Sequence, residues 1–213
     1  FWIDRYEASV WASTEGTGMQ YGGAGVDNVP ATFPQNGQWT APLYASSRAG
    51  VRPSLLTWFQ ASEACRVVGA RLPNSTEWLT AGRGTPDPGA SNGSGGLCNT
   101  MSSGLRNTGE GTLCRSAWGV EDMIGNIMEM TEEWYPGVGG GGGAVPWPAG
   151  YNGDGTYNVA SRIILPGGTR TAVPAIAWRG GSYGDGTLAG LFYMDLDYSP
   201  AYFGFGFRCV RTR

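Results

Sequence analysis

Glycine-rich segments of unusual length dominate this chain. It contains 37 glycines in 213 residues, about twice the usual share. Residues 84–112 are rich in Gly, Ser and Asn, and residues 136–150 include five consecutive glycines. Long segments without regular structure are uncommon inside a compact domain. The sequence therefore predicts a loop-rich α+β fold with few, short regular elements.

Two short helices are expected between the loops. Thr57 and Gln60 have the spacing of a capping box, and an apolar stripe follows them, which predicts a helix over residues 58–68. Asn74, with a Glu three residues later, predicts a second helix over residues 75–81. Glycines follow both segments and are expected to end the helices.

Strands are expected at the two ends of the chain. Residues 1–10 alternate loosely between apolar and polar, and residues 207–210 read as a final strand. Side chains alternate clearly in residues 192–197. We expect an inner face of Phe192, Met194 and Leu196, and an outer face that shows Tyr193, Asp195 and Asp197 to solvent.

Composition excludes several functional classes. The chain has no histidine, a net charge of −3 and no basic stripe, so nucleic acid is not an expected partner. No run of about 18 apolar residues is present, so membrane insertion is not expected. Without histidine the chain lacks the commonest general base. These features favour recognition over proton-transfer chemistry.

The four cysteines are Cys65, Cys98, Cys114 and Cys209, and no two of them form a CxxC pair. Metal-ligand spacing is therefore absent, and without histidine a zinc site has few ligands to use. Two disulfides are one interpretation, in which Cys98 and Cys114 close a short loop. Buried free thiols are the other.

Five sequence blocks together resemble the formylglycine-generating-enzyme (sulfatase-modifying factor) family, whose fold is a variant of the C-type lectin-like fold. They occur in family order and span nearly the whole chain. The blocks are Phe1–Glu7, Ala70–Pro73 with Glu77 and Trp78, Gly125–Thr131 with Trp134, Arg179–Ser182, and Gly206–Cys209. The resemblance implies a single domain over residues 1–213 with that fold.

The enzymes of this family depend on side chains that this chain lacks. Formylglycine-generating enzymes use a copper-binding cysteine pair shortly after the Gly-Gly-Ser block, and the matching positions lie close to Asp185 and Gly190. The related iron-dependent sulfoxide synthases of ergothioneine biosynthesis need histidine ligands. Glycine cannot replace a nucleophile or a metal-bound thiolate. We therefore expect that the protein is not an enzyme.

The C-terminal segment is similar to the variable proteins of diversity-generating retroelements, which carry a hypervariable ligand-binding region on the lectin-like fold. The frame WRGGS…AGLF…L…P…GFRCVR looks like theirs, and it implies a variable region at about residues 179–211. In such systems adenines of a template repeat are mutated, often in AAC codons. Changes in the first two bases of an AAC codon can produce every residue between Ser182 and Phe205 except Met194.

This resemblance divides the segment into framework and contact positions. The framework is expected to include Gly180, Gly181, Leu191, Phe192, Met194, Leu196, Phe207 and Cys209. Aromatic residues give large contact area with few rotors, and Asp and Gly add polarity and access. The expected variable, ligand-facing positions are Tyr183, Gly184, Asp185, Leu188, Asp195, Asp197, Tyr198, Tyr202, Phe203 and Phe205.

Some of these positions allow more than one interpretation. Phe207 is expected in the core, whereas Phe203 and Phe205 fit the core and a binding face equally. Tyr193 fits either an exposed position or a framework position. Asp185, Asp195 and Asp197 are interpreted as solvated recognition acids. The alternatives are a carboxylate pair for acid/base work and a calcium-dependent sugar site.

The resemblance also implies a structural calcium site and a disulfide. Asp122 and Glu129 would bind calcium by side chain, and Gly125 and Ile127 by carbonyl oxygen. The alternative is a turn in which Asn126 and Glu129 bond to backbone amides. Cys65 and Cys209 match a cysteine pair that is bridged in secreted family members, so we expect them to lie close together.

The combined hypothesis is a non-enzymatic ligand-binding protein whose C-terminal region is diversified by a retroelement. Its expected partner is a protein or another surface macromolecule, and it requires no cofactor beyond the structural calcium considered above. The rival hypotheses are a divergent formylglycine-generating-type enzyme and a calcium-dependent carbohydrate-binding lectin. The chain opens on Phe1 and Trp2, so we expect a targeting region that is not included here, for a cell-surface, secreted or phage-associated protein.

Overall fold

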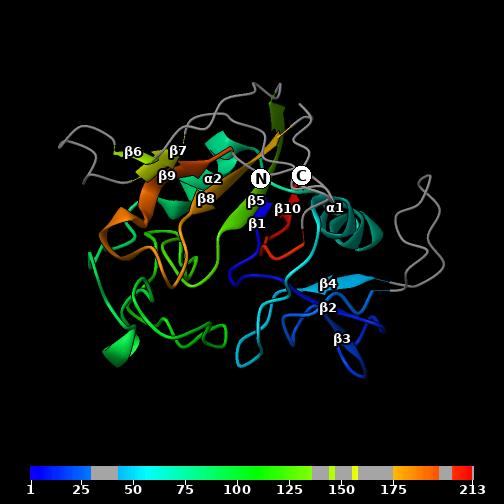
Figure 1. Cartoon of the computed structure of the whole chain (residues 1–213). Helices are drawn as coiled ribbons and strands as arrows, with labels where there is room; N and C mark the ends of the chain where they lie inside the picture. The colour runs from blue at the N-terminus through cyan, green and yellow to red at the C-terminus, as the bar shows by residue number, and fades with distance from the viewer. Residues whose placement is uncertain (30–42, 136–143, 147–154, 158–174, 197–202, 213) are drawn as a thin grey trace, which may run out of the picture.

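The computed structural model describes residues 1–29, 43–135, 144–146, 155–157, 175–196 and 203–212. Short strands and loops dominate it, with two α-helices in the described part of the chain (Figure 1). This is the loop-rich α+β architecture predicted from the glycine-rich segments. The five glycines at 139–143 lie outside the described residues.

Both predicted helices are present, and capping boxes begin both. Helix α1 spans Trp58–Val67, with the Thr57 side chain accepting from the Gln60 amide and the Gln60 side chain accepting from the Thr57 amide. Helix α2 spans Ser75–Gly82 and uses Asn74 and Glu77 in the same way. These reciprocal bonds satisfy amides that a helix start leaves without partners.

A mixed five-stranded sheet forms the largest layer, in the order β5-β8-β9-β7-β6 (Figure 1). Strand β9 lies inside the sheet, antiparallel to β8 and parallel to β7. Helix α2 packs against β5 and β9. The strands are β5 (Glu129–Tyr135), β6 (Ala144–Pro146), β7 (Gly155–Tyr157), β8 (Ala175–Gly180) and β9 (Gly190–Asp195).

Two small sheets accompany the five-stranded sheet in the described part of the chain. One has the order β3-β2-β4 and lies against α1; the other pairs β1 with β10, so the labelled N- and C-termini lie side by side (Figure 1). The expected strands at 1–10 and 207–210 are therefore shorter and displaced. The observed strands are β1 (Trp2–Ile3), β2 (Ser9–Trp11), β3 (Gln20–Tyr21), β4 (Tyr44–Ser46) and β10 (Val210–Arg211).

The main core lies between α1, the sheet and the C-terminal segment. Phe207 is fully buried, as predicted, and Trp178 stacks on Phe205 with ring centroids 3.5 Å apart. A disulfide joins Cys65 in α1 to Cys209. The C-terminal segment is thus attached to the core by packing and by a covalent link.

The outer face predicted for residues 192–197 is wrong, whereas the inner position predicted for Leu196 is confirmed, because Leu196 is buried. Tyr193 and Asp195 are buried, with exposed fractions of 1% and 5%, whereas Phe192 and Met194 are half-buried. The Tyr193 hydroxyl lies 3.7 Å from the sulfur of Met128. The face of β9 that carries Tyr193 and Asp195 is therefore the one that packs inside the protein. Asp197 lies outside the described residues.

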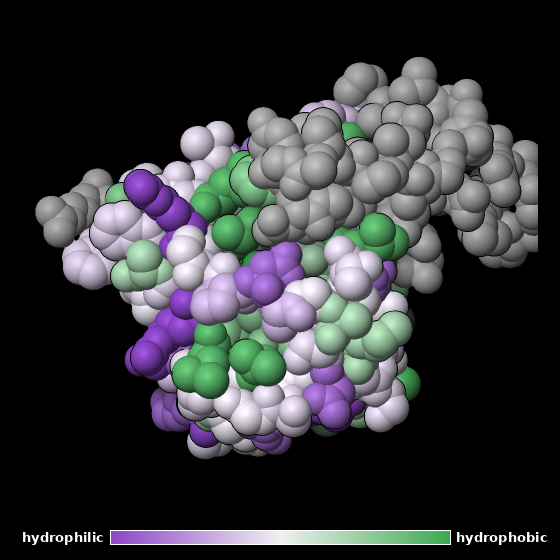
Figure 2. Space-filling view, turned by 90° about the vertical axis from the view of Figure 1, so that its left-hand side faces the viewer, coloured by the Kyte–Doolittle hydropathy of each residue, from purple (hydrophilic) through white to green (hydrophobic). Residues whose placement is uncertain are grey.

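The molecular surface is mixed in character. The face shown in Figure 2 carries hydrophobic side chains in patches separated by polar ones. Among the described residues, no helix is long and apolar enough to cross a membrane.

Candidate functional site

A groove with a volume of about 390 Å³ brings the C-terminal segment together with four earlier parts of the chain. We call it the Tyr183 groove. Ser182, Tyr183, Gly204 and Phe205 come from the expected variable region. The other lining residues come from framework segments and are Gly25, Arg52, Leu55, Ser103, Gly104, Leu105, Ile127 and Met128.

The loop that carries Tyr183 is shaped by a close approach of its own backbone. Gly181 has a φ of +75°, and a Cβ placed there would lie 2.7 Å from the Cα of Ala189, so only glycine fits without strain. The Asp185 carboxylate accepts from the Ser182 amide at 2.6 Å and from the Ser182 hydroxyl at 2.8 Å. Asp185 therefore stabilises the loop from within.

Main-chain bonds attach this loop to two neighbouring segments. The Tyr183 amide donates to the Asn126 carbonyl at 3.0 Å, and the Ser102 amide donates to the Tyr183 carbonyl at 2.8 Å. The Gly186 amide donates to the Thr100 carbonyl at 2.7 Å. These bonds hold the Tyr183 backbone in place and leave its side chain to line the groove.

A second disulfide, between Cys98 and Cys114, supports the same region. Both cysteines are buried in a small cluster with Ile124 and Ala189. Ala189 follows the 3₁₀ turn Gly186–Leu188 of the Tyr183 loop. The disulfide thus stabilises the glycine-rich segment on which the Tyr183 loop rests.

Phe205 forms the other side of the groove and is held firmly. Its ring stacks on Trp178, and its carbonyl accepts from the Leu56 amide at 3.0 Å. Next to it, a side chain at Gly206 would clash with Ile127. The half-buried Phe205 ring therefore belongs both to the core and to the groove, the two alternatives left open by the sequence.

The structure brings some of the predicted contact residues together and separates others. Tyr183 and Phe205 line the groove. Gly184 is exposed, and Asp185, Leu188 and Phe203 are half-buried outside the groove lining. Asp195 is buried, so it is not the solvated acid that the sequence suggested. Asp197, Tyr198 and Tyr202 lie outside the described residues.

The residues expected to bind calcium have other partners. Asp122 forms a buried ion pair with Arg106, and Glu129 pairs with Arg208 and accepts from the Trp78 indole N–H at 2.8 Å. Within the described ranges, no three acidic or cysteine side chains are grouped to hold a metal ion. Two carboxylates already neutralised by arginines do not fit the oxygen-rich coordination that calcium requires.

The alternative turn is present in part. The Asn126 side-chain oxygen accepts from the Arg106 amide at 2.9 Å, and its Nδ2 donates to Glu7 at 2.6 Å. Glu129 bonds to side chains rather than to backbone amides.

Burial raises the pKa of Glu7 well above its ordinary value, and the negative charges of Asp122 and Glu129 add to this effect.

Sequence reasoning missed the framework side of the groove. Arg52, Leu55, Leu105 and Met128 all line it. The first three occupy segments without a recognisable motif, and Met128 lies in the Gly125–Thr131 block, which the sequence linked to calcium rather than to ligand binding. Residues 84–112 were predicted only as a loop. Tertiary folding brings these segments to the C-terminal region, and no local spacing in the sequence marks them.

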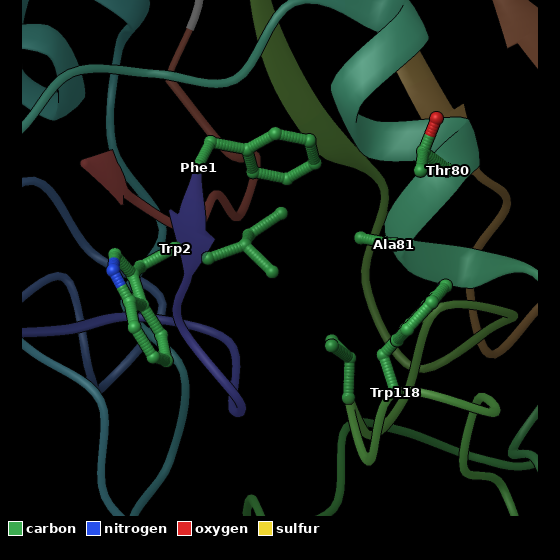
Figure 3. Close-up of a pocket in the computed structure, with 7 residues that line it drawn as sticks. Phe1, Trp2, Thr80, Ala81 and Trp118 are labelled. Atoms are coloured by element: carbon green, nitrogen blue, oxygen red, sulfur yellow. The ribbon is translucent and has the colours of Figure 1, made fainter. Parts of the chain in front are cut away.

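A second hollow, of about 380 Å³, lies between β1, α2 and the loop of Trp118 (Figure 3). Phe1, Trp2 and Trp118 are exposed by 52%, 62% and 67%. None of the predicted contact residues lines this hollow. The Tyr183 groove is therefore the candidate site.

Comparison with known proteins agrees with this architecture. The Major Tropism Determinant P3c variant is 23% identical with a TM-score of 0.53, and the U1 variant is 22% identical with a TM-score of 0.55. Each match covers 98% of this chain and 49% of the solved chain, so the chain spans about half the length of these structures. The likeness shows a C-type lectin-like fold.

A search of curated proteins gave no match. Residues 53–213 match the sulfatase-modifying factor enzyme 1-like domain. This match covers most of the chain, including both helices, the five-stranded sheet and the C-terminal segment. The chain therefore belongs to the sulfatase-modifying factor enzyme 1-like family.

Proposed function

We propose that this protein is a non-enzymatic ligand-binding protein whose C-terminal region, about residues 179–211, is diversified by a retroelement. The ligand is a protein or another surface macromolecule, and it binds at the Tyr183 groove. The observation that carries this proposal is the groove lining, where residues of the expected variable region face a fixed framework wall. A diversified surface needs this combination of changeable contacts and constant support.

The donor chemistry of the chain supports binding over catalysis. All four cysteines are in disulfides, and the sequence contains no histidine. The copper-thiolate and iron-histidine sites of the family's enzymes therefore have no ligands of the required type. The names of the compared structures, which describe variants of one tropism determinant, are consistent with a binding surface that differs between copies of one fold.

The DNA around the gene tests the diversification part. We expect a reverse transcriptase gene and a near-copy of the segment that encodes residues 179–211. The two copies should differ at template adenines, including the codons of Tyr183 and Phe205, and agree at Gly181, Phe207 and Cys209. Differences between the two copies at all four template bases would count against diversification. The absence of a second copy would also count against it.

A binding assay tests the recognition part. Immobilised protein is exposed to surface fractions of candidate host cells, and captured proteins are identified by mass spectrometry. Tyr183→Ala should reduce capture of the specific partner, whereas Arg66→Gln, on the exposed surface of α1, should not. Equal capture by both variants would place recognition elsewhere.

The enzyme alternative is favoured only by the family to which the chain belongs. It is tested by incubating copper-treated protein with a cysteine-containing sulfatase peptide and measuring formylglycine by mass spectrometry. Turnover would overturn the proposal.

A further inference from the structure

Arg52 is a free cation in the Tyr183 groove, whose other described lining residues are uncharged. It is exposed and is the sole charged residue among the described residues that line the Tyr183 groove. Other arginines, such as Arg71, Arg106 and Arg208, are paired with carboxylates. The described structure gives the Arg52 guanidinium no hydrogen bond or ion pair, so it is available to a ligand.

The backbone of Arg52 is held although its side chain is not. Its carbonyl accepts from Nε2 of Gln20 at 2.6 Å. Three residues later, the Leu55 amide donates to the Gly22 carbonyl at 3.2 Å. Residues 52–55 are thus fixed to the segment around β3, and Arg52 projects from a fixed position.

Apolar side chains line the same groove as this cation. Leu55, Leu105, Ile127 and Met128 line the same groove, and the aromatic rings of the variable region complete it. A carboxylate suits an arginine because the guanidinium can donate two parallel hydrogen bonds to it. The apolar walls suit an aliphatic or aromatic side chain beside that carboxylate.

We propose that the framework wall of the Tyr183 groove selects a protein segment that presents an acidic side chain next to an apolar one, with Arg52 pairing with the acid. This inference rests on the proposed function, because it assumes that the ligand enters this groove. Nucleic acid is a poorer fit, since phosphate backbones need several cations and the described lining of the groove has one.

The consequence is a preference for an acidic group in the ligand that stays the same while the variable side chains of the groove change. Arg52 lies outside residues 179–211, so replacement of the variable side chains leaves it in place. Variants would differ in fine specificity while sharing a requirement for an acid. With a net charge of −3 the whole protein does not attract acidic partners at long range, so Arg52 must act through direct contact.

Selection from a random-peptide library tests this inference. Wild-type protein should enrich peptides in which Asp or Glu neighbours Leu, Phe or Met. Arg52→Gln should lose the enrichment for acids and bind a synthetic wild-type-selected peptide about tenfold more weakly. Arg52→Glu should enrich Lys or Arg instead. Arg83→Gln is the matched control, because Arg83 is also exposed but does not line the groove.

The same selection with Tyr183→Ala separates this inference from the proposed function. Peptides that need Tyr183 but are unaffected by changes at Arg52 would overturn the inference and leave groove binding intact. Peptides insensitive to both residues would overturn both. Failure of the wild type to enrich any peptide would also count against the acid preference. Thermal melting of each variant verifies that it is folded.

Discussion

Arg208 and Glu129 form a two-point ion pair in the core, with Nε of Arg208 2.6 Å from Oε2 of Glu129 and a second bond through Nη2. Both side chains are essentially inaccessible to solvent. Arg208 also donates to the carbonyls of Asp4, Arg5 and Glu121. One arginine thereby links the C-terminal segment to β5 and to the N-terminal segment.

Glu129→Gln should therefore destabilise the protein strongly. It leaves the buried Arg208 charge without its counterion, which typically costs about 3–5 kcal/mol in the free energy of unfolding. Urea denaturation followed by tryptophan fluorescence measures this. Glu132→Gln, which removes a partly exposed partner of Arg71, should cost less than about 1 kcal/mol. Similar losses for the two variants would contradict this account.

The two disulfides should contribute differently. Cys65 and Cys209 are 144 residues apart and Cys98 and Cys114 are 16 apart. Loop-closure entropy predicts a loss of roughly 5 kcal/mol for the paired Cys→Ser change in the first and about 3 kcal/mol in the second. Loss of the second disulfide should weaken ligand binding even where the protein is still folded, because that disulfide supports the Tyr183 loop. Loss of the first should not weaken binding by the folded protein. Mass spectrometry of peptides from the non-reduced protein checks that both disulfides form. Recovery of four free thiols would contradict this prediction.

Glu7 should make stability depend on pH. Burial, reinforced by Asp122 and Glu129, raises its pKa well above the 4.5 of the unfolded chain. The folded state therefore keeps a proton that the unfolded chain loses, and the stability contributed by this group is complete below pH 4.5 and falls as pH rises toward the folded pKa. Glu7→Gln retains an acceptor for Asn126 without the charge.

The thermal midpoint of Glu7→Gln should therefore decline less above pH 4.5 than that of the wild type. Differential scanning fluorimetry across pH gives both curves. Glu110→Gln, an exposed substitution, is the control and should follow the wild type. Parallel curves for Glu7→Gln and wild type would show that Glu7 does not titrate as described.

Substitutions in the C-terminal segment should separate framework from contact. Phe207→Ala removes a fully buried ring and should cost about 3–5 kcal/mol. Tyr183→Ala should change the free energy of unfolding by less than about 1 kcal/mol, since the side chain is half-exposed and its backbone bonds remain. Chemical denaturation of both variants checks this. A large loss for Tyr183→Ala would assign that ring to the core.

Calcium should not stabilise the protein. Asp122 and Glu129 are each paired with an arginine, so binding would first have to break two buried ion pairs. Thermal midpoints measured with excess calcium and with EDTA should agree. A clear rise with calcium, abolished by Asp122→Asn, would restore the structural calcium site.

Local chemistry explains which elements the sequence could predict. Both helices begin at capping boxes formed by residues three apart, and such signals are readable without tertiary information. The five family blocks led to the correct fold for the same reason, since the residues of each block lie close together in the sequence. Strand β9 shows the limit of such reasoning. Alternation predicts which side chains share a face, but tertiary packing decides which face is buried, and here it is the face of Tyr193 and Asp195. Arg52 could not be predicted, because only the folded chain places it beside Phe205 in one groove.

The two hydrogen bonds at residue 183 are made by its peptide group, not by its ring. Its φ is not among the left-handed values found elsewhere in the loop, so any L-residue with a backbone amide can adopt the same conformation. A random substitution at this position therefore changes the side chain that lines the groove and leaves the backbone conformation of the loop intact. Most variants produced by mutagenesis at this position would therefore fold, and selection could act on their affinity for the ligand alone.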